Sequence, residues 1–361
     1  MCDTWVAINA TIMEKIHPLI TGKKATPMRY AQQMIEALKA NDLPVLDILQ
    51  EVQIAPTELA NPSARITAAQ MESLSALTMA RLDDEALGWF ERRLPWGSYG
   101  MLVRASLSAP NLEVALKRWC RHHGLLTKAV SLHVFKEHDV AGIELLTPGV
   151  TAEHHEFCSV TLLRNAIGVA SWVIDSRIAM QRATFAYAPP AHADAYADLF
   201  PCAASFEAPA TRLYFDAAYL RLPTCRGEDE VNTMLQRALP LTVRHYPKDR
   251  LLVQRVRHLL RTSPQRWRDA DSVAEALSMS VRSLHRQLAA EGAQWQALKT
   301  EERMRVANSL LLHTDRGLKQ VADASGFEDV KSFSRAFKVW SQVSPNQFRR
   351  ERRGEVPQTG R

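Results

Sequence analysis

The sequence predicts two domains: an α+β N-terminal domain, helix-rich with a small sheet, and an all-α C-terminal domain with two helix-turn-helix units joined by a long helix. Three observations lead to this prediction. A short helical pattern occurs twice, in residues 272–288 and 320–337. Before residue 240, helical and strand-like periodicities alternate without a repeated βαβ order. The charge balance also changes sign near residue 240.

Composition excludes several classes of protein. The 361 residues are enough for two or more domains with substantial cores, and a hydrophobic content of 46% is ordinary for a globular chain. There is no run of about 18 apolar residues that could span a membrane, and the N-terminus does not resemble a secretion signal. The five cysteines are scattered and form no CxxC pair. We therefore expect a cytoplasmic protein without membrane segment, disulfide framework, metal or cofactor.

Charge separates the two halves of the chain. Residues 241–361 hold 23 Lys and Arg against 13 Asp and Glu, a balance of +10, whereas residues 1–240 hold 22 against 26, a balance of −4. A basic module joined to a mildly acidic one is typical of a DNA-binding domain attached to another domain. Charge alone leaves open a basic face that only meets solvent. The repeated helical unit favours DNA.

The N-terminal domain is expected to begin with helices and continue with a mixture of helices and strands. Helices are predicted for Val6–His17, from Pro27 to a break at Asn41, for Val45–Val52, Ala68–Leu82, Asn111–His122, Glu153–Val173 and Glu228–Leu239. Strands are predicted for Met101–Ala105, Ala129–Phe135, Ala141–Leu146 and Arg182–Tyr187, and short edge segments for Leu213–Asp216 and Tyr219–Pro223.

These patterns give domain boundaries. Residues 1–26 are an N-terminal segment, 27–240 the first domain, 241–250 a linker, 251–350 the helical domain and 351–361 a basic tail. Within the linker, the stretch His245–Arg250 is the strongest candidate, because the charge balance switches there.

The helical domain is predicted to open with a helix from Asp249 to Ser263-Pro264. Ser272, followed three residues later by Glu275, matches a capping box that would start the first unit. In each unit the second helix has its own N-cap residue, Ser280 or Asp329, and the second unit has one extra residue in its turn.

A long helix is expected between the units, over Gln294–Leu312. Its apolar residues recur at helical spacing: Trp295, Leu298, Met304, Ala307 and Leu311. Nineteen residues of helix extend about 28 Å. That length would set two recognition helices about one duplex turn, or about 34 Å, apart.

Spacing also separates the inward and outward faces of the recognition helices. Leu284, Leu288, Phe333 and Phe337 are predicted to face inward. The outward residues that could reach base edges are Arg282, His285, Arg286, Lys331, Ser334 and Arg335. Those expected at phosphates are Lys338, Arg349 and Arg350. Any one of them could instead be a solvated surface residue.

Enzyme chemistry finds little support in the motifs. Glu153-His154-His155-Glu156 contains metal-ligand types, but no histidine follows at the spacing of the HExxH zinc motif. Neither a nucleophile elbow nor a P-loop nor a dinucleotide fingerprint occurs. We therefore do not expect an enzyme. The competing class is an architectural DNA-binding protein without strong sequence preference.

Residues 250–350 resemble the DNA-binding domain of the AraC/XylS family of bacterial transcription regulators. The resemblance is carried by Val321–Lys338, Ser344-Pro345 and Phe348-Arg349, with Arg303, Ala307 and Leu310-Leu311 matching the family's central helix. Gln342 departs from the pattern, because the family usually has glycine there. The resemblance implies seven helices, binding to double-stranded promoter DNA and contact with RNA polymerase.

Residues 27–215 are similar to the sensing domain of the ornithine-utilisation-type branch of that family. The similarity is carried by Tyr30, the segment from Asp84-Glu85 to Gly88, Gly97–Gly100 and the region of Phe206. It implies a small-molecule effector of unknown identity, a homodimer and a sequence-specific regulator that activates transcription. The residues considered for the effector pocket are Trp96, Tyr99, Trp119, His154 and Trp172. Aromatic residues in a mixed domain are more often part of the core than ligand contacts, so none of them is assigned.

Overall fold

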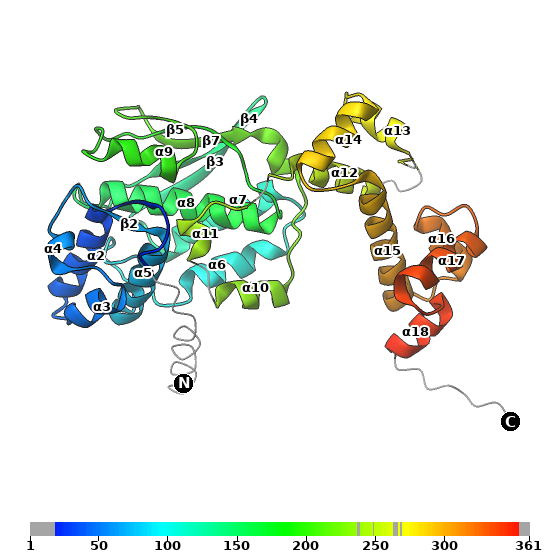
Figure 1. The fold of residues 1–361 in the computed structure, drawn as a ribbon, viewed down its shortest axis with the longest axis horizontal. Helices are drawn as coiled ribbons and strands as arrows, with labels where there is room; N and C mark the ends of the chain where they lie inside the picture. The colour runs from blue at the N-terminus through cyan, green and yellow to red at the C-terminus, as the bar shows by residue number, and fades with distance from the viewer. Residues whose placement is uncertain (1–18, 237–238, 248, 263–265, 268, 354–361) are drawn as a thin grey trace. The chain divides into compact units, whose positions relative to one another are not determined.

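The computed structural model describes residues 19–236, 239–247, 249–262, 266–267 and 269–353 (Figure 1). The chain divides between Asp249 and Arg250 into two compact units. The helix predicted at Val6–His17 and the stop signal Ser263-Pro264 lie outside the described residues, as does most of the basic tail. None of the described helices is long and apolar enough to cross a membrane.

The first unit opens with a small helical layer. Its elements are β1 (Lys24–Pro27), α2 (Met28–Ala40), α3 (Leu46–Glu51), α4 (Pro56–Leu59), β2 (Arg65–Thr67) and α5 (Ala68–Leu82), with β1 and β2 antiparallel. Met34 and Leu38 of α2 are fully buried. A capping box between Thr67 and Gln70 starts α5, because each supplies the hydrogen bond that the other's backbone lacks. The helices predicted from Pro27, Val45 and Ala68 are confirmed.

A five-stranded sheet forms the other layer. Its strands are β3 (Ser131–Glu137), β4 (Val140–Leu146), β5 (Met180–Thr184), β6 (Ala203–Ser205) and β7 (Thr211–Asp216), in the order β3-β4-β7-β5-β6, with only β5 and β6 parallel. The prediction of an edge segment at Leu213–Asp216 is wrong, since β7 is the middle strand and Leu213 and Phe215 are fully buried. Tyr219 lies in a 3₁₀ helix, η2 (Ala217–Arg221), and not in a strand.

The remaining helices of the first unit are α6 (Ser98–Leu107), α7 (Leu112–Leu126), α8 (His155–Val173), η1 (Ala193–Ala195), α9 (Tyr196–Leu199), α10 (Glu228–Leu235) and α11 (Pro240–Val243). Figure 1 shows α7 and α8 beside one face of the sheet, and both contact its strands. Most residues of α8 are buried, so it is the central helix of the unit. The single helix predicted for Glu228–Leu239 ends at Leu235.

The strand predicted at Met101–Ala105 is wrong, because these residues lie in α6. Gly97 precedes the helix with φ of 96°, a left-handed conformation that suits glycine. The Glu85 carboxylate then accepts hydrogen bonds from the backbone N–H groups of Gly97 and Tyr99, both at 2.8 Å. A carboxylate at a helix N-terminus satisfies free N–H groups and meets the positive end of the helix dipole. A residue distant in the sequence thus starts α6.

The second unit is all-α, as predicted. Its described residues form seven helices: α12 (Leu251–Thr262), α13 (Ala270–Ala276), α14 (Val281–Ala290), α15 (Trp295–His313), α16 (Leu318–Ala324), α17 (Val330–Ser341) and α18 (Pro345–Arg353). The long helix predicted over Gln294–Leu312 is α15.

The capping box predicted at Ser272 is wrong. Helix α13 begins earlier, and Asp269 is its N-cap, with the Ser272 backbone N–H donating to Asp269 Oδ1 at 2.8 Å. That hydrogen bond stabilises the charged carboxylate and lowers the pKa of Asp269. Ser272 therefore lies in the first turn of the helix that it was expected to precede.

The apolar stripe of α15 also differs from the prediction at Met304, which is exposed, whereas Glu302 is only 4% exposed. Arg261 of α12 donates from Nε and Nη2 to the two oxygens of Glu302 at 2.9 and 2.8 Å, and Arg305 Nε donates at 2.8 Å. Burial alone would raise the pKa of Glu302, but these hydrogen bonds outweigh it and the pKa is lowered. A bidentate ion pair thus joins α12 to α15.

Candidate nucleic-acid interface

The two helix-turn-helix units have separate cores and share one helix. Around the first, the buried residues are Leu252, Val253, Val256, Leu260, Val273, Ala274, Leu284, Leu288, Trp295 and Leu298. Around the second, they are Ala307, Leu311, Val321, Ala322, Phe333 and Phe337. The first turn of α15 therefore packs in one core and its C-terminal half in the other. Each recognition helix, α14 or α17, is fixed by its own set of apolar contacts.

The turn between the two helices has the same backbone geometry in both units. Ser278 and Gly326 occupy matching positions with left-handed φ values of 54° and 79°. After the turn, the N–H of Met279 donates to the carbonyl of Ala274 and that of Phe327 to the carbonyl of Ala322, both at 2.9 Å. This hydrogen bond closes the C-terminus of the first helix and directs the chain into the recognition helix.

The recognition helices begin at the predicted N-caps. Ser280 Oγ accepts from the N–H of Ser283 at 3.2 Å, and Asp329 Oδ1 accepts from the N–H of Ser332 at 2.8 Å. The backbone hydrogen bond from Ser332 is the main reason that the pKa of Asp329 is lowered. Both helices are thereby fixed at the end that a helix-turn-helix unit presents to base edges.

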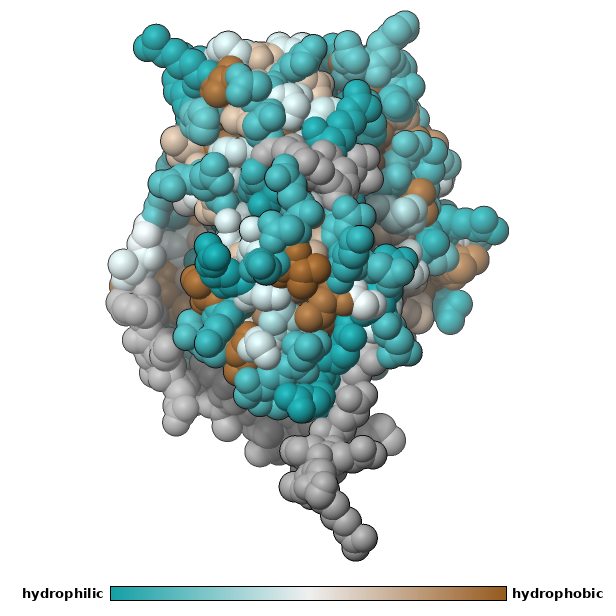
Figure 2. Space-filling model, turned by 90° about the vertical axis from the view of Figure 1, so that its right-hand side faces the viewer, coloured by the Kyte–Doolittle hydropathy of each residue, from teal (hydrophilic) through white to brown (hydrophobic). Residues whose placement is uncertain are grey.

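The inward residues are placed as predicted: Leu284, Leu288, Phe333 and Phe337 are completely buried. The residues predicted for base edges lie on the opposite face of their helices. All are exposed except Ser334, which is partly exposed: Arg282, His285, Arg286, Lys331, Ser334 and Arg335. Among the described residues, no hydrogen bond or ion pair holds these six side chains. Most of the coloured surface in Figure 2 is hydrophilic, with smaller apolar patches between the polar residues.

The three residues predicted at phosphates differ in their surroundings. Lys338 on α17 and Arg350 on α18 are exposed. Arg349 is half-buried, and its Nη2 donates to the backbone carbonyl of Arg316 at 2.6 Å, so it also holds α18 against the loop before α16. A phosphate contact by Arg349 would use its other N–H groups.

Arg303 has a supporting role that spacing did not predict. Its Nη2 donates to the Gly326 carbonyl at 2.6 Å, and its guanidinium lies over the Phe327 ring at 4.7 Å. Both contacts hold the turn of the second unit against α15. The match of Arg303 to the central helix of the AraC/XylS family was the sequence signal that marked this residue.

Glycine is expected to stabilise the second unit at two positions where the backbone is left-handed. Ser278 has φ of 54°, and Gln342, the C-cap of α17, has φ of 65°. Side chains disfavour this region and glycine does not, so Ser278→Gly and Gln342→Gly should each raise the free energy of unfolding of the second unit by about 0.5–1 kcal/mol. Urea unfolding of the full chain measures this. Gly326→Ser is the reverse control and should lower the same transition; stabilisation by that variant would contradict the argument.

The pocket candidates of the first unit do not converge on one site. Trp119 and Trp172 are buried in the core, whereas Trp96 is 53% exposed. Tyr99 stacks on Trp119 with ring centroids 6.0 Å apart. His154 bonds to Thr151 beside α8. In the part of the chain that the structure describes, no group of three or more His, Cys, Asp or Glu side chains could hold a metal ion.

Comparison with known families divides the chain in the same way. Residues 43–224 match the family described as the arabinose-binding domain of AraC transcription regulator, N-terminal. Residues 273–351 match a family described as a helix-turn-helix domain. The first match runs from α3 to η2 and includes the whole five-stranded sheet, and the second runs from within α13 through both helix-turn-helix units.

Individual relatives are similar over long stretches. The ornithine utilization regulator of Pseudomonas aeruginosa is 26% identical over 333 residues, which cover 92% of this chain and 98% of that protein. The transcriptional activator NphR of a Rhodococcus species is 32% identical over 156 residues, 39% of this chain and 45% of that protein. The crystal structure of the transcriptional regulator CdpR from Pseudomonas aeruginosa covers 89% of this chain and 98% of its own, at 18% identity and a TM-score of 0.31.

Proposed function

Because the chain belongs to the AraC family of transcription regulators, with a ligand-binding N-terminal domain and a helix-turn-helix DNA-binding domain, we propose that it reads two adjacent boxes of promoter DNA. Residues 251–350 would bind the DNA, residues 27–240 would sense the small-molecule effector and mediate self-association, and residues 241–250 would link them. The sign of regulation is activation, which the relative named a transcriptional activator supports.

The observation that carries this proposal is a pair of recognition faces with separate cores on one helix. Arg286 and Arg335 occupy matching positions on the exposed sides of α14 and α17. An arginine can donate two hydrogen bonds to guanine O6 and N7. Helix α15 has 19 residues and extends about 28 Å, which suits recognition helices in successive major grooves of one duplex face.

Selection of bound sequences from random double-stranded DNA tests the proposal. The full chain should enrich two short boxes with centres about 10 base pairs apart. Recovery of DNA without any enriched sequence would contradict the proposal of a sequence-specific regulator. It would favour an architectural protein, which binds through phosphates and DNA shape.

Arg335→Ala should weaken binding to the selected DNA by about 1–3 kcal/mol and relax the preference at one base position. Arg335 is exposed, so its removal leaves the core of the second unit intact. Affinities for a set of single-base variants of the boxes measure both effects. The matched control is Arg350→Ala, which should weaken all these sequences alike. If Arg335→Ala keeps the preferences of the parent at every position, its role at a base edge is wrong.

We also propose the remaining partners. The DNA-bound regulator would contact RNA polymerase and pair with a second copy of itself, as expected for an activator of this family. It would act in the cytoplasm, where bacterial promoters are, and would carry out no catalytic step. Co-precipitation with RNA polymerase on promoter DNA, and the mass of the protein in solution, test the two partners separately.

A further inference from the structure

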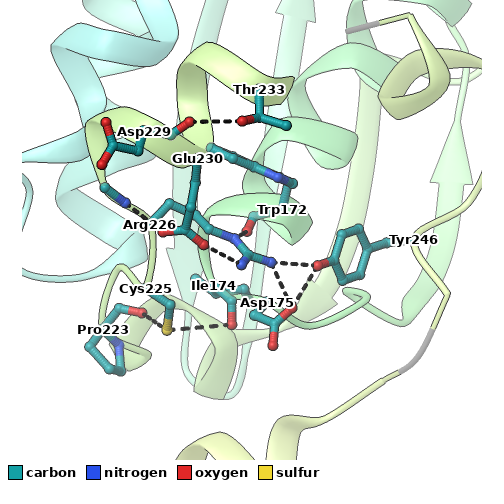
Figure 3. Close-up of polar contacts among 11 residues, drawn as sticks. Trp172, Ile174, Asp175, Pro223, Cys225, Arg226, Asp229, Glu230, Thr233 and Tyr246 are labelled. Carbon is teal, nitrogen blue, oxygen red and sulfur yellow. Dashed lines mark hydrogen bonds and ion pairs between the residues drawn. The ribbon is translucent and has the colours of Figure 1, made fainter. Parts of the chain in front are cut away.

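The segment that leads out of the first unit is fastened to α8 by a set of polar contacts. We call residues 240–247 the exit segment. Arg226 Nη2 donates to Asp175 Oδ1 at 2.7 Å and to the Tyr246 hydroxyl at 2.8 Å, and that hydroxyl donates to Asp175 at 2.6 Å (Figure 3). Arg226 Nε also donates to the carbonyl of Trp172 at 3.0 Å. The last turn of α8 and the exit segment therefore share one hydrogen-bond network.

The exit segment also packs closely on the middle of α8. A Cβ atom added to Gly168 would lie 1.9 Å from the backbone oxygen of Leu241, so only glycine permits this approach. Beside this contact lies a cavity of about 20 Å³ between α8, the start of β5 and the exit segment. Its basic lining residues are Arg164, Arg177, Arg244 and His245.

The guanidinium of Arg164 is buried, and no carboxylate among the described residues forms an ion pair with it. It is 7% exposed. Its Nε donates to the carbonyl of Thr242 at 2.7 Å and its Nη1 to the carbonyl of Leu199. Burial lowers the pKa of Arg164 to about 10. A buried guanidinium that binds only carbonyl groups keeps most of the cost of leaving water, and an anion would offset it.

Among the described residues, one carboxylate forms an ion pair with an arginine of the cavity. Glu72 lies 3.9 Å from Arg244, at the limit of an ion pair. The Asp198 carboxylate binds Lys23, while His245 contacts the Asp198 backbone carbonyl at 2.9 Å. Burial is the largest cause that lowers the pKa of His245, and the positive charges of Arg164 and Arg177 lower it further. Arg164 and Arg177 therefore lie near each other at the cavity, and neither forms an ion pair with a carboxylate among the described residues.

We infer that this cavity is a binding site for a small oxyanion, a carboxylate or a phosphate, held by Arg164, Arg177 and Arg244 between α8 and the exit segment. The inference rests on the proposed function, and it names the chemical class of an effector. A cavity of about 20 Å³ holds one water-sized group. One oxygen of a carboxylate or phosphate fills that volume, and the rest of the anion extends toward the exposed side chains of Arg177 and Arg244. Bound there, the anion ties the exit segment to α8 and so acts on the chain that leads to the DNA-binding unit.

Thermal unfolding of the full chain tests the site with sodium phosphate, sodium acetate and sodium succinate, each against sodium chloride at equal ionic strength. At about ten times its Kd, a bound anion should raise the Tm of the first unit by about 3 °C. The phosphate arm and the two carboxylate arms show which oxyanion is preferred. Arg177→Gln and Arg244→Gln should each remove most of the shift. Arg121→Gln, an exposed arginine on α7, removes the same charge elsewhere and should keep it.

Two results would overturn the site: no anion raises the Tm above the chloride control, or the Arg177 and Arg244 variants respond like Arg121→Gln. A second readout, the affinity for the selected DNA with and without the active anion, tests the regulatory role. A Tm shift with unchanged DNA affinity would support anion binding at this cavity but would refute its role in regulating DNA binding. Failure of the proposed function is distinguishable, because it appears as absent DNA boxes whatever the anions do.

Discussion

Phe337→Ala is expected to destabilise the second helix-turn-helix unit by about 3–5 kcal/mol, because it removes a fully buried ring from the centre of that core. The ring contacts Phe333 and Phe348, with centroids 5.6 and 5.3 Å away. A loss of this size is a large part of the stability of a small unit. We expect α17 to lose its fixed position, and footprinting should show protection lost at one of the two boxes while the other remains.

The matched control is Leu288→Ala, at the corresponding position of the first unit, which is expected to cost about 2–5 kcal/mol and to remove protection at the opposite box. The two variants are expected to affect opposite boxes because each unit packs around its own core on α15. If either variant abolishes both footprints equally, the two units unfold together as one cooperative body, and the separate cores do not give them independent stability.

The DNA-binding unit could be predicted well from the sequence because its signals are local. The positions of Leu284, Leu288, Phe333 and Phe337 follow from helical spacing alone, and all four are fully buried. The N-caps at Ser280 and Asp329 act on N–H groups only three residues ahead. Short-range hydrogen bonds and a 3.6-residue period leave little for distant contacts to change.

The predictions are wrong where contacts between distant segments determine the secondary structure, the strand order or the burial of a residue. The Met101–Ala105 run is apolar enough for a strand or a helix, and Glu85 selects the helix from a separate segment. The pattern of Leu213–Asp216 predicts an extended segment, but its position in the middle of the sheet depends on pairing with β4 and β5. Burial of Glu302 depends on Arg261 of another helix. The periodicity of one segment does not indicate which distant residues that segment will contact.

The candidate sites show the same division. Exposure of Arg282, Arg286 and Arg335 follows from the period of their helices, so the face could be predicted. The basic cavity could not, because Arg164 lies on a buried helix and meets Arg244 only through the path of the exit segment. The sequence of α8 is apolar on all sides, which indicates a buried helix, but it does not show which groups Arg164 contacts.

The stability of the first unit is expected to fall as the pH drops from about 6.5 to about 4, through His123. Burial lowers the pKa of His123 from 6.5 to about 4. Between these two values the unfolded chain binds a proton that the folded protein excludes, so acid favours unfolding. The slope is about 1.4 kcal/mol per pH unit, and the total about 3 kcal/mol. Above pH 6.5 both states are neutral at this residue and its contribution is constant.

His123→Gln isolates this effect, because every other group titrates in both proteins. Urea unfolding at a series of pH values should give curves that are parallel above pH 6.5 and converge or cross below it, as the wild type loses stability faster. The physical reason lies in the surroundings of the ring. Nε2 lies 3.3 Å from the Tyr99 hydroxyl, and Nδ1 is buried without a hydrogen-bond partner among the described residues.

A protonated imidazole needs an acceptor for each of its two N–H groups. In the folded unit only Nε2 has an oxygen within reach, so the second N–H would be left unsatisfied in the core, at a cost that adds to the desolvation of the charge. Curves for wild type and His123→Gln that stay parallel down to pH 4 would mean that the folded unit accommodates the charged ring. In that case a rearrangement around Nδ1 must supply an acceptor, and nuclear magnetic resonance titration of the His123 ring would then report a pKa near 6.5.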